Sequence, residues 1–433
     1  MHIVIIGNGI TGITCARNIR KRDTSAEITV ISSESEHFFS RTALMYIYMG
    51  HMKYEHTKPY EDWFWEKNRI KLIKGHVIRV STESKVIICD DGYTLQYDKL
   101  VIASGSKPNK FNWPGQNSHG VQGLYSLQDL HSMESQTQGI SDAVIIGGGL
   151  IGIEMAEMLL SRQIKVHFLV REKYYWSNVL PEEEAQLISR HIREHHISLR
   201  LDTELKEIIA DSDGKVHGVI TQSGESIPCQ FVGLTAGVSP SISFIENSGI
   251  GTNMGILVNR YLETNVADVY AAGDCAEFEN PQADHAPVEQ LWYTGKMQGE
   301  TLAKTLTGNR TAYQRGIWFN SAKFLDIEYQ TYGTMLPQLG PEQESFYWEH
   351  SDGRKSFRAT YNKDDRSLIG FNLLGLRFRQ AIAEEWIRNR KPVDQCIREL
   401  SQGWFDPEFS KPYYRDILNA FLACTDFKPV SIN

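Results

Sequence analysis

Near its N-terminus the chain reads HIVIIGNGITG over residues 2–12, a run of β-branched residues followed at once by the pattern G-x-G-x-x-G. The run predicts a buried strand, and the residues after the glycines predict a helix that ends near residue 22. In such a turn the first glycine permits a tight bend, the second lets backbone N–H groups approach a pyrophosphate, and the third lets helix and strand pack closely. The helix N-terminus adds about half a positive charge. We therefore predict a dinucleotide site at Gly7, Gly9, Ile10, Thr11 and Gly12.

The same pattern returns 140 residues later, where the chain reads AVIIGGGLIG over residues 143–152. A helix to about residue 162 and a strand over residues 165–170 are predicted to follow it. This internal repeat predicts an α/β protein with two Rossmann-like folds, and hence two dinucleotide sites. The residues predicted for the second site are Gly147, Gly149, Leu150, Ile151 and Gly152.

The composition argues against several other classes of protein. The chain has 433 residues, which suggests two to three domains, and 45 Lys and Arg against 53 Asp and Glu give a formal net charge of −8. A mildly acidic balance is unlike the basic face that nucleic-acid binding needs. No stretch approaches ~18 consecutive apolar residues, so no transmembrane segment is predicted. The N-terminal strand has no basic signal-peptide region, and we expect a cytoplasmic protein.

The cysteines and histidines give no sign of a metal site. The six cysteines are spread along the chain without a C-x2-C or C-x4-C pair. We expect reduced thiols that pack as small buried hydrophobes. Among the 14 histidines, only His195 and His196 are neighbours, and they fall in a predicted helix-to-strand connection. The sequence therefore predicts no bound metal.

Carboxylates at the predicted strand ends are candidates for holding ribose hydroxyls. Glu34 lies twenty-two residues beyond Gly12, close to the spacing that this role requires. In the second fold Glu172 lies twenty residues beyond Gly152 and suits the ribose of NAD, whereas its neighbour Arg171 suits the 2′-phosphate of NADP. The pair leaves both nucleotides open, and we slightly favour NADPH.

A further predicted strand, over residues 269–272, ends in Gly273 and Asp274. Small residues at this point let a ligand lie against the backbone, and the carboxylate can accept hydrogen bonds from a polyol. A helix starting near Cys275 would direct its positive end at whatever lies beyond it. Both Gly273 and Asp274 are predicted cofactor-binding residues.

Four ordered motifs in the first 310 residues resemble the FAD-dependent pyridine nucleotide-disulfide oxidoreductase superfamily. They lie at residues 7–12, 97–105, 147–154 and 269–277. The resemblance implies FAD in the first fold and NAD(P)H in the second, with Asp274 on the ribityl chain of FAD. It also implies that Glu154, the one predicted catalytic residue, lies where the nicotinamide meets the flavin.

The resemblance extends the predicted cofactor-binding set. Residues 103–105 match the family's A-T-G motif with serine in place of threonine. Trp292 occupies the position at which family members place a residue against the edge of the flavin, and aromatic core packing is the alternative. The residues added to the set on this basis are Val77, Ala103, Ser104, Gly105, Gly237 and Trp292.

The branch of the superfamily depends on the segment after the second strand. Residues 37–46 contain no cysteine, so a thiol relay of the disulfide-reductase kind is not expected. The segment at residues 39–41 resembles instead the Y-x-R of ferredoxin, rubredoxin and nitrite reductase-associated flavoproteins. On this resemblance Arg41 contacts the FAD pyrophosphate or ribose, with a plain exposed arginine as the alternative. Tyr46 occupies the region where many relatives have a lysine near the flavin.

The resemblance implies a discontinuous FAD-binding domain of residues 1–112 and 242–315, an NAD(P)-binding domain of residues 113–241, and a C-terminal α+β interface domain of residues 316–433. We expect an FAD-dependent NAD(P)H oxidoreductase that passes hydride to flavin N5 and then electrons to an external acceptor. The first choice of acceptor is a small iron–sulfur protein of the ferredoxin, rubredoxin or Rieske type.

Two other functions and two surface roles stay open at this stage. The other functions are a type-II NAD(P)H:quinone oxidoreductase and a redox-responsive interaction partner like apoptosis-inducing factor. The C-terminal domain is expected to dock the carrier and is a possible homodimer interface. The basic residues expected at the docking surface, with ordinary solvated charges as the more common alternative, are Arg377, Arg379, Arg388, Arg390 and Lys391.

Overall fold

The computed structural model describes residues 1–282, 285–406 and 408–424. Residues 425–433 of the predicted C-terminal domain lie outside this part. The chain forms two compact units, each of them assembled from separate segments. The first unit comprises residues 1–147, 158–165 and 205–315, and the second comprises residues 148–157, 166–204 and 316–433. The three predicted domains group the segments differently, and their boundaries stay a prediction.

The first glycine turn lies at the centre of a five-stranded parallel sheet, as the sequence predicted. The strand order is β19-β7-β1-β2-β3, with β1 in register with β2 on one side and β7 on the other. Apart from the edge strand β3, its strands are largely apolar and buried, which is typical of a parallel sheet that is covered on both faces. The strands are β1 (His2–Ile6), β2 (Glu27–Ser32), β3 (Ile70–Lys74), β7 (Lys99–Ile102) and β19 (Val269–Ala271).

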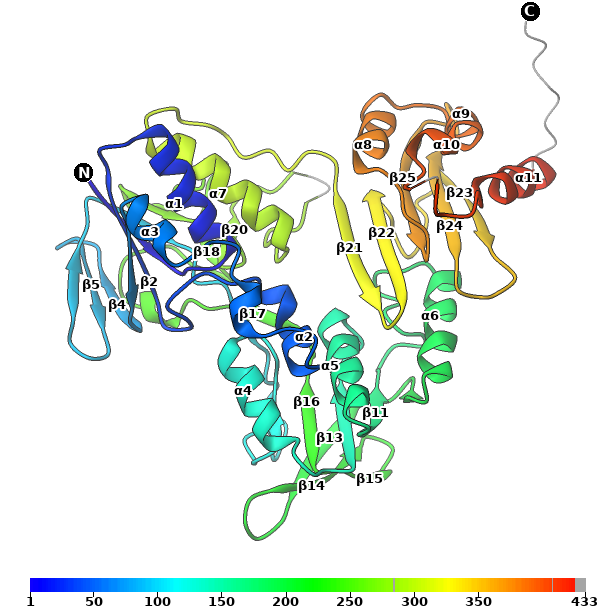
Figure 1. The fold of residues 1–433 in the computed structure, drawn as a ribbon, viewed down its shortest axis with the longest axis horizontal. Coiled ribbons are helices and arrows are strands. Elements are labelled where there is room, and N and C mark those ends of the chain that lie inside the picture. Colours follow the sequence, from blue (N-terminus) through cyan, green and yellow to red (C-terminus); the bar gives the residue numbers. More distant parts are fainter. Residues whose placement is uncertain (283–284, 407, 425–433) are drawn as a thin grey trace, which may run out of the picture. The chain divides into compact units, whose positions relative to one another are not determined.

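Two helices lie side by side on this sheet, α1 (Ile10–Arg22) and α7 (Trp292–Leu306) (Figure 1). They pack closely because α7 presents glycine to α1. A Cβ atom on Gly299 would lie 2.5 Å from the carbonyl oxygen of Thr11, and one on Gly295 would lie 2.6 Å from the Thr11 hydroxyl. Any larger residue at either position would force the helices apart, so these glycines join segments almost 300 residues apart in the sequence.

Two antiparallel three-stranded sheets, one antiparallel strand pair and one parallel strand pair complete the first unit. One three-stranded sheet is made of hairpins, β4 (Val77–Ser81), β5 (Val86–Cys89) and β6 (Thr94–Gln96). A second contains β13 (Leu205–Ala210), β14 (Val216–Thr221) and β15 (Ser226–Pro228). Two strand pairs also belong here, β8 (Ser106–Pro108) with β17 (Val238–Pro240), and β18 (Ile256–Val258) with β20 (Ala276–Phe278).

The second glycine turn also follows a strand of a five-stranded sheet, in the order β12-β11-β10-β16-β9. Strand β10 pairs in parallel with β16, as do β16 with β9 and β11 with β12. This topology confirms the predicted internal repeat. The strands are β9 (Val121–Gln122), β10 (Asp142–Ile146), β11 (Lys165–Leu169), β12 (Ser198–Arg200) and β16 (Phe231–Leu234), with helices α4 (Leu127–Gln136), α5 (Leu150–Ser161) and α6 (Glu182–Glu194).

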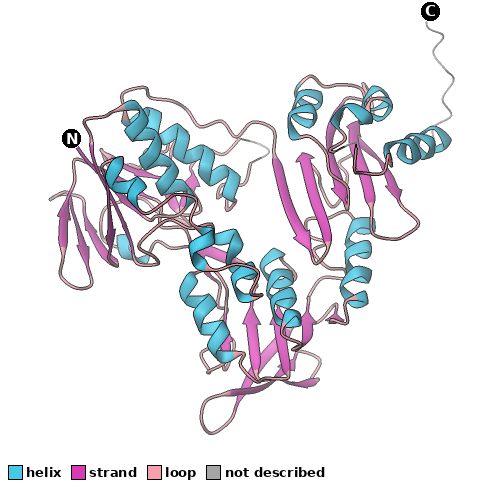
Figure 2. Ribbon diagram, in the orientation of Figure 1, coloured by secondary structure: helices cyan, strands magenta, loops and turns pink. Residues whose placement is uncertain are grey.

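The C-terminal segment forms an antiparallel sheet in the order β21-β22-β25-β24-β23, with helices at its C-terminal end (Figure 2). Its core is unusually aromatic and includes Phe357, Phe371 and Trp386, all almost fully buried. The elements are β21 (Phe319–Phe324), β22 (Ile327–Gly333), β23 (Gln343–Glu349), β24 (Ser356–Asn362), β25 (Leu368–Leu374), α8 (Gln380–Arg388), α9 (Val393–Arg398), α10 (Leu400–Gly403) and α11 (Tyr414–Cys424). Among the described residues, no helix is both long enough and apolar enough to cross a bilayer.

Candidate functional site

The first glycine turn has a shape that only glycine allows at two of its three positions. Gly7 has a positive φ of 108°, and a Cβ atom there would lie 2.1 Å from the carbonyl oxygen of Ala103. A Cβ on Gly12 would lie 2.0 Å from the carbonyl oxygen of Gly7. A Cβ on Gly9 would instead meet no described atom within 4 Å, and Gly9 is the N-cap of α1 with no side-chain cap. The N-terminus of α1 therefore opens onto free space, which fits a bound pyrophosphate.

The second glycine turn repeats this arrangement. Gly147 has a φ of 109°, and its Cβ would lie 2.7 Å from the carbonyl oxygen of Thr235. A Cβ on Gly149 would meet no described atom within 4 Å. Leu150 and Ile151 are half-buried in the first turn of α5, and Gly152 is buried behind them. Both predicted turns thus have the backbone shape that their sequence requires.

The structure brings Glu34 and Arg41 together as an ion pair. Arg41 donates from Nη1 to Oε1 of Glu34 at 3.0 Å and from Nη2 to Oε2 at 2.5 Å, a two-bond geometry that fixes both side chains. The backbone N–H of Leu127 also donates to Oε1, at 3.0 Å. A carboxylate has about four acceptor positions, so Glu34 retains capacity for ribose hydroxyls. Arg41 is held beside this carboxylate, not extended into solvent.

Tyr125 connects this ion pair to Asp274. The Arg41 guanidinium lies 4.4 Å from the centre of the Tyr125 ring and donates to the Tyr125 carbonyl. The Tyr125 hydroxyl donates to Oδ2 of Asp274 at 3.2 Å, and Ser106 Oγ donates to the same oxygen at 3.3 Å. Burial raises the pKa of Asp274, although these hydrogen bonds and Arg41 oppose the rise. Four polar side chains from distant segments therefore meet at one place, which we call the Asp274 cluster: Glu34, Arg41, Tyr125 and Asp274.

The other predicted residues of the first site surround this cluster or lie elsewhere in the first unit. Gly273 has a φ of 79°, and its N–H donates to Gln298 at 2.7 Å. Ser104 Oγ donates to the carbonyl of Ser241 at 2.7 Å, and a Cβ on Gly105 would lie 2.8 Å from the Tyr125 hydroxyl. The remaining three are Val77, buried in β4, Gly237, exposed before β17, and Trp292, 37% exposed at the start of α7.

Arg171 and Glu172, the two residues expected to select NADPH or NADH, form an ion pair with each other. Arg171 Nε donates to Oε1 of Glu172 at 2.8 Å, and both residues follow β11. The Arg171 side chain is 72% exposed, whereas that of Glu172 is 22% exposed. An exposed guanidinium is accessible to a phosphate, and a half-buried carboxylate is suited to a ribose, so the geometry keeps both nucleotides open.

Glu154 lies half-buried on α5, one turn before Glu157. Burial, reinforced by the negative charge of Glu157, raises the pKa of Glu154 to about 7, against the opposing charge of Lys323. Lys323, on β21, donates to Oε1 of Glu157 at 2.7 Å. Nearby, the buried Tyr175 donates from its hydroxyl to the carbonyl of Gly149 at 2.8 Å. Glu154 can therefore exist in either protonation state close to neutral pH.

Glu154→Gln is expected to stabilise the protein at pH 8 and to have little effect at pH 5. The folded state raises the pKa of Glu154 from 4.5 to about 7, so the folded protein binds this proton more tightly than the unfolded chain does. The resulting contribution to the free energy of unfolding is complete below about pH 4.5 and is lost as the pH rises through 7. Glutamine removes the cost of the buried charge, about 1–3 kcal/mol at pH 8. Urea unfolding at both pH values measures this, with the exposed Glu66→Gln as control. An equal change at both pH values would contradict the assignment.

The sequence analysis missed several residues of these sites. Tyr125, Ser106, Lys323 and Tyr175 lie outside every recognisable motif, and only their positions in the fold reveal them. The cysteines were expected to be buried thiols without a relay function. Five cysteines are buried and Cys424 is exposed, and burial raises the pKa of the Cys15 and Cys275 thiols. Neither thiol is therefore placed to act as a thiolate.

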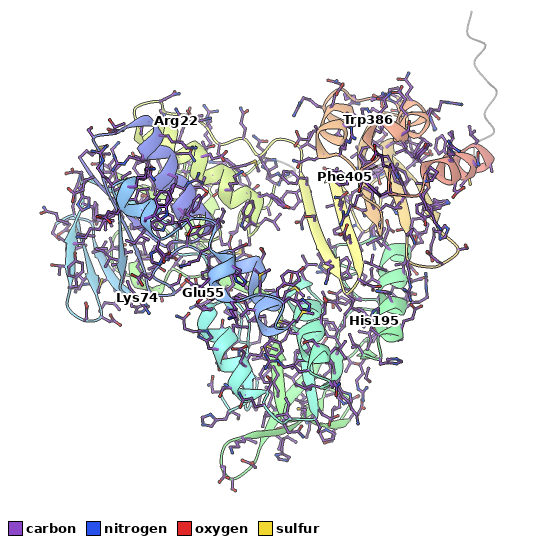
Figure 3. All side chains as sticks on the ribbon, in the orientation of Figure 1. Arg22, Glu55, Lys74, His195, Trp386 and Phe405 are labelled. Carbon is purple, nitrogen blue, oxygen red and sulfur yellow. The ribbon has the colours of Figure 1, made fainter. Side chains whose placement is uncertain are left out.

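The basic residues expected at the docking surface are mostly paired with acids. Arg377 forms an ion pair with Glu328, Arg388 with Glu384, Arg390 with Asp365 and Lys391 with Glu399. Arg379 is exposed at the start of α8. Figure 3 labels Trp386 and Phe405 in the same part of the fold. Because neighbouring carboxylates neutralise most of these cations, we expect only weak electrostatic steering of an acidic partner.

Comparison with known proteins identifies the class to which the fold and these turns belong. The family model described as pyridine nucleotide-disulphide oxidoreductase matches residues 1–299, and the chain belongs to this family. The match confirms the resemblance drawn from the four motifs.

Particular relatives narrow the comparison. The chain is 29% identical over 428 residues to the assimilatory nitrate reductase electron transfer subunit of Bacillus subtilis, covering 98% of this chain and 53% of that protein. It is 28% identical to the NAD(P)H nitrite reductase of the same organism, covering 76% of this chain and 40% of that protein. It is 29% identical to the rubredoxin-NAD(+) reductase of Acinetobacter baylyi, covering 87% of this chain and 94% of that protein. The chain thus spans about half the length of the two Bacillus relatives.

Solved structures share the fold. An NAD-dependent persulfide reductase from A. fulgidus superimposes with a TM-score of 0.84 at 23% identity, over 98% of this chain and 83% of that one. At this level of identity the likeness concerns the fold alone. It confirms the α/β architecture with two Rossmann-like folds that the repeat predicted.

Proposed function

We propose that the chain is an FAD-dependent NAD(P)H oxidoreductase whose electrons leave for a small iron–sulfur protein. The observation that carries the proposal is the pair of glycine turns, each with a helix N-terminus that opens onto free space at its second glycine. Two such turns fit two dinucleotides. FAD, when bound, supplies a carrier that takes a hydride from a nicotinamide and releases electrons to a second partner. FAD and NAD(P)H follow from family membership, and the choice of acceptor is the proposal's own step.

In this proposal the first unit holds FAD. The N–H groups at Gly9 and the start of α1 bind the pyrophosphate, and Glu34 binds the adenosine ribose while Arg41 keeps its carboxylate in place. Asp274, oriented by the hydroxyls of Tyr125 and Ser106, accepts from the ribityl chain. FAD fits this site because the side chains of Glu34, Arg41, Tyr125 and Asp274 already lie close together in the structure. The proposed boundaries of the FAD, NAD(P) and C-terminal domains remain those of the sequence analysis.

The second glycine turn holds the nicotinamide nucleotide in the same way. The N-terminus of α5 binds its pyrophosphate, and Arg171 or Glu172 contacts the adenosine ribose. Glu154 lies one turn into α5, where a side chain is positioned to orient the nicotinamide amide group. Its pKa of about 7 means that this contact changes from acceptor to donor across the neutral range.

An iron–sulfur carrier is favoured as acceptor over a thiol or a quinone. The relatives include a protein named as a rubredoxin-NAD(+) reductase and one named as an electron transfer subunit. The buried thiols of Cys15 and Cys275 leave no relay between FAD and partner. Free thiols throughout also fit a reducing compartment, so we propose a cytoplasmic location. A homodimer through the C-terminal domain stays a prediction.

The test is anaerobic reduction of the FAD-loaded protein by NADH or NADPH, followed by rapid mixing with ferredoxin, rubredoxin, or a quinone in liposomes. The proposal expects fast turnover with an iron–sulfur carrier, unchanged after alkylation of exposed thiols. Turnover that requires quinone and liposomes would favour the quinone reductase instead. A stable long-wavelength band with poor turnover against every acceptor would favour a redox-responsive interaction partner.

Arg171→Ala is expected to raise the KM for NADPH about tenfold while changing the KM for NADH less than about twofold, because a charge-assisted bond to the 2′-phosphate is lost. Steady-state kinetics with both nucleotides measure the ratio. Glu172→Gln serves as the matched variant and should raise the KM for NADH more than the KM for NADPH. Equal effects of Arg171→Ala on both nucleotides would remove the slight preference for NADPH.

A further inference from the structure

Three potential metal ligands meet in the second unit, away from both glycine turns in the sequence. His191 lies in the last turn of α6 and His195 at its C-cap, one helical turn later. Asp326 lies in the tight turn between β21 and β22. Nε2 of His191 is 2.5 Å from Oδ1 of Asp326, and Nε2 of His195 is 3.3 Å from the same oxygen. Figure 3 labels His195 beside the end of α6. One atom from each residue falls within 4.8 Å of the others.

The hydrogen bonds of His195 direct a lone pair at this point. Nδ1 of His195 lies 3.0 Å from the carbonyl oxygen of His191, and since a carbonyl only accepts, Nδ1 carries the proton. In the neutral form of the ring, Nε2 then has a lone pair, and this lone pair faces Oδ1 of Asp326. A lone pair and a carboxylate oxygen at this distance repel each other unless a cation, either a proton or a metal ion, lies between them. Histidine ligands of metals commonly have this arrangement, in which the second ring nitrogen donates to a backbone carbonyl.

His191 is constrained from the other side. Its side chain is 1% exposed, and its Nδ1 is buried without a hydrogen bond to any described residue. The nearest acid to Nδ1 is Glu194, at 3.7 Å. The ring cannot turn to water, so its Nε2 has only Asp326 to meet. A polar ring buried this completely needs a strong partner to offset its desolvation.

The surroundings of the three side chains suit a bound cation that water can also reach as a ligand. Both histidines lie at the C-terminal end of α6, where the helix dipole is negative. The Asp326 side chain is 56% exposed, so it can move outward and water can reach its free side. Arg354 lies 3.8 Å from Oδ2 of Asp326 and 3.4 Å from Oε2 of Glu194. Arg354 therefore engages the carboxylate oxygen that does not face the histidines, and Oδ1 stays available.

We propose that His191, His195 and Asp326 bind a divalent transition-metal ion, Zn²⁺ being the best chemical match, with water as the fourth ligand. Two imidazoles and one carboxylate are donors that Zn²⁺ accepts, and ligands about 2.0–2.1 Å from zinc lie about 3.3 Å apart in a tetrahedron. The His195 separation already has this value. The 2.5 Å contact of His191 must lengthen, and the proton that it shares with Asp326 leaves for solvent on binding.

The sequence analysis predicted no bound metal, because the ligands of this site are not neighbours in the chain. The adjacent pair was His195 and His196, whereas the cluster uses His191 on the same helix face and an aspartate 131 residues beyond His195. A bound ion would hold the β21–β22 turn against α6. Lys323, three residues before Asp326, bonds to Glu157, so the ion would also steady the element that faces Glu154. The proposal is independent of the proposed function.

The test is calorimetric titration of the chelator-treated, tag-free, full-length protein with Zn²⁺, alongside the visible spectrum with Co²⁺. We expect one tight site per chain, a rise in Tm with Zn²⁺, and tetrahedral Co²⁺ bands. His195→Ala and Asp326→Asn should each weaken binding by about 100-fold or more, and exposed His131→Ala should not. Asp326→Asn keeps the shape of an exposed turn, so it serves even if a histidine variant folds poorly. Absent Zn²⁺ binding, or binding unchanged in Asp326→Asn and His195→Ala, would overturn the proposal.

Discussion

Gly9→Val is expected to yield a protein that folds but does not retain FAD, with affinity lowered by at least ~100-fold, or about 2.7 kcal/mol. A Cβ atom at Gly9 meets no described atom within 4 Å, and the φ of Gly9, −69°, is one that valine adopts readily. The fold therefore has no reason to change. The methyl groups of valine would occupy the space at the N-terminus of α1 that the proposal assigns to the pyrophosphate. Flavin absorbance after FAD reconstitution and gel filtration measures the loss.

Gly149→Val is the matched control, because a Cβ at Gly149 also meets open space. This variant should stay yellow and lose its response to NAD(P)H. The two substitutions thus separate the two sites within one chain. Full retention of FAD by Gly9→Val, or loss of FAD by Gly149→Val, would contradict the assignment of the two turns.

Arg358→Met is expected to destabilise the second unit by about 3–5 kcal/mol. Arg358, on β24, is 6% exposed and donates to Oε1 of the fully buried Glu184 at 2.8 Å and to Oε2 of Glu183 at 2.6 Å. Removing the guanidinium leaves the Glu184 carboxylate buried without its cation. Burial raises the pKa of Glu184 even with Arg358 present, so the unpaired charge is costly. Urea unfolding at pH 8 measures the effect.

The double variant Glu184→Leu with Arg358→Met supplies the control. Replacing both charges with apolar side chains removes the unpaired carboxylate, so most of the lost stability should return. FAD content should be unchanged in both variants because the predicted FAD residues lie in the first unit. A double variant as unstable as the single one would show that Arg358 acts through packing and not through its charge.

The sequence predicted the fold where local chemistry determines it. Both glycine turns, their strands and their helices were confirmed, because a positive φ at Gly7 and Gly147 and a close approach behind Gly12 admit only glycine. The match of the family model to residues 1–299 confirmed the family. The helix after the second glycine turn was predicted to end at about residue 162, and α5 ends one residue earlier, at Ser161. Helix ends are the part of a pattern that tertiary packing most often shifts.

The polar partners of the candidate sites were not predictable in this way. Tyr125 precedes α4 by two residues and belongs to no motif, yet its ring lies against Arg41 and its hydroxyl reaches Asp274. Lys323 belongs to β21, which the sequence did not show as a strand because its residues alternate weakly between buried and exposed. Contacts of this kind depend on long-range chain arrangement, which periodicity and spacing do not encode.

Anaerobic titration of the FAD-loaded protein with NADPH or NADH tests the central claim most directly. The claim is that the N-terminus of α1 holds FAD and that the N-terminus of α5 holds the nicotinamide nucleotide that reduces it. We predict that flavin absorbance bleaches in proportion to added nucleotide, with an endpoint near one nucleotide per FAD, and that Gly149→Val abolishes this response. Flavin that binds in full but stays oxidised with an excess of both nucleotides would contradict the account.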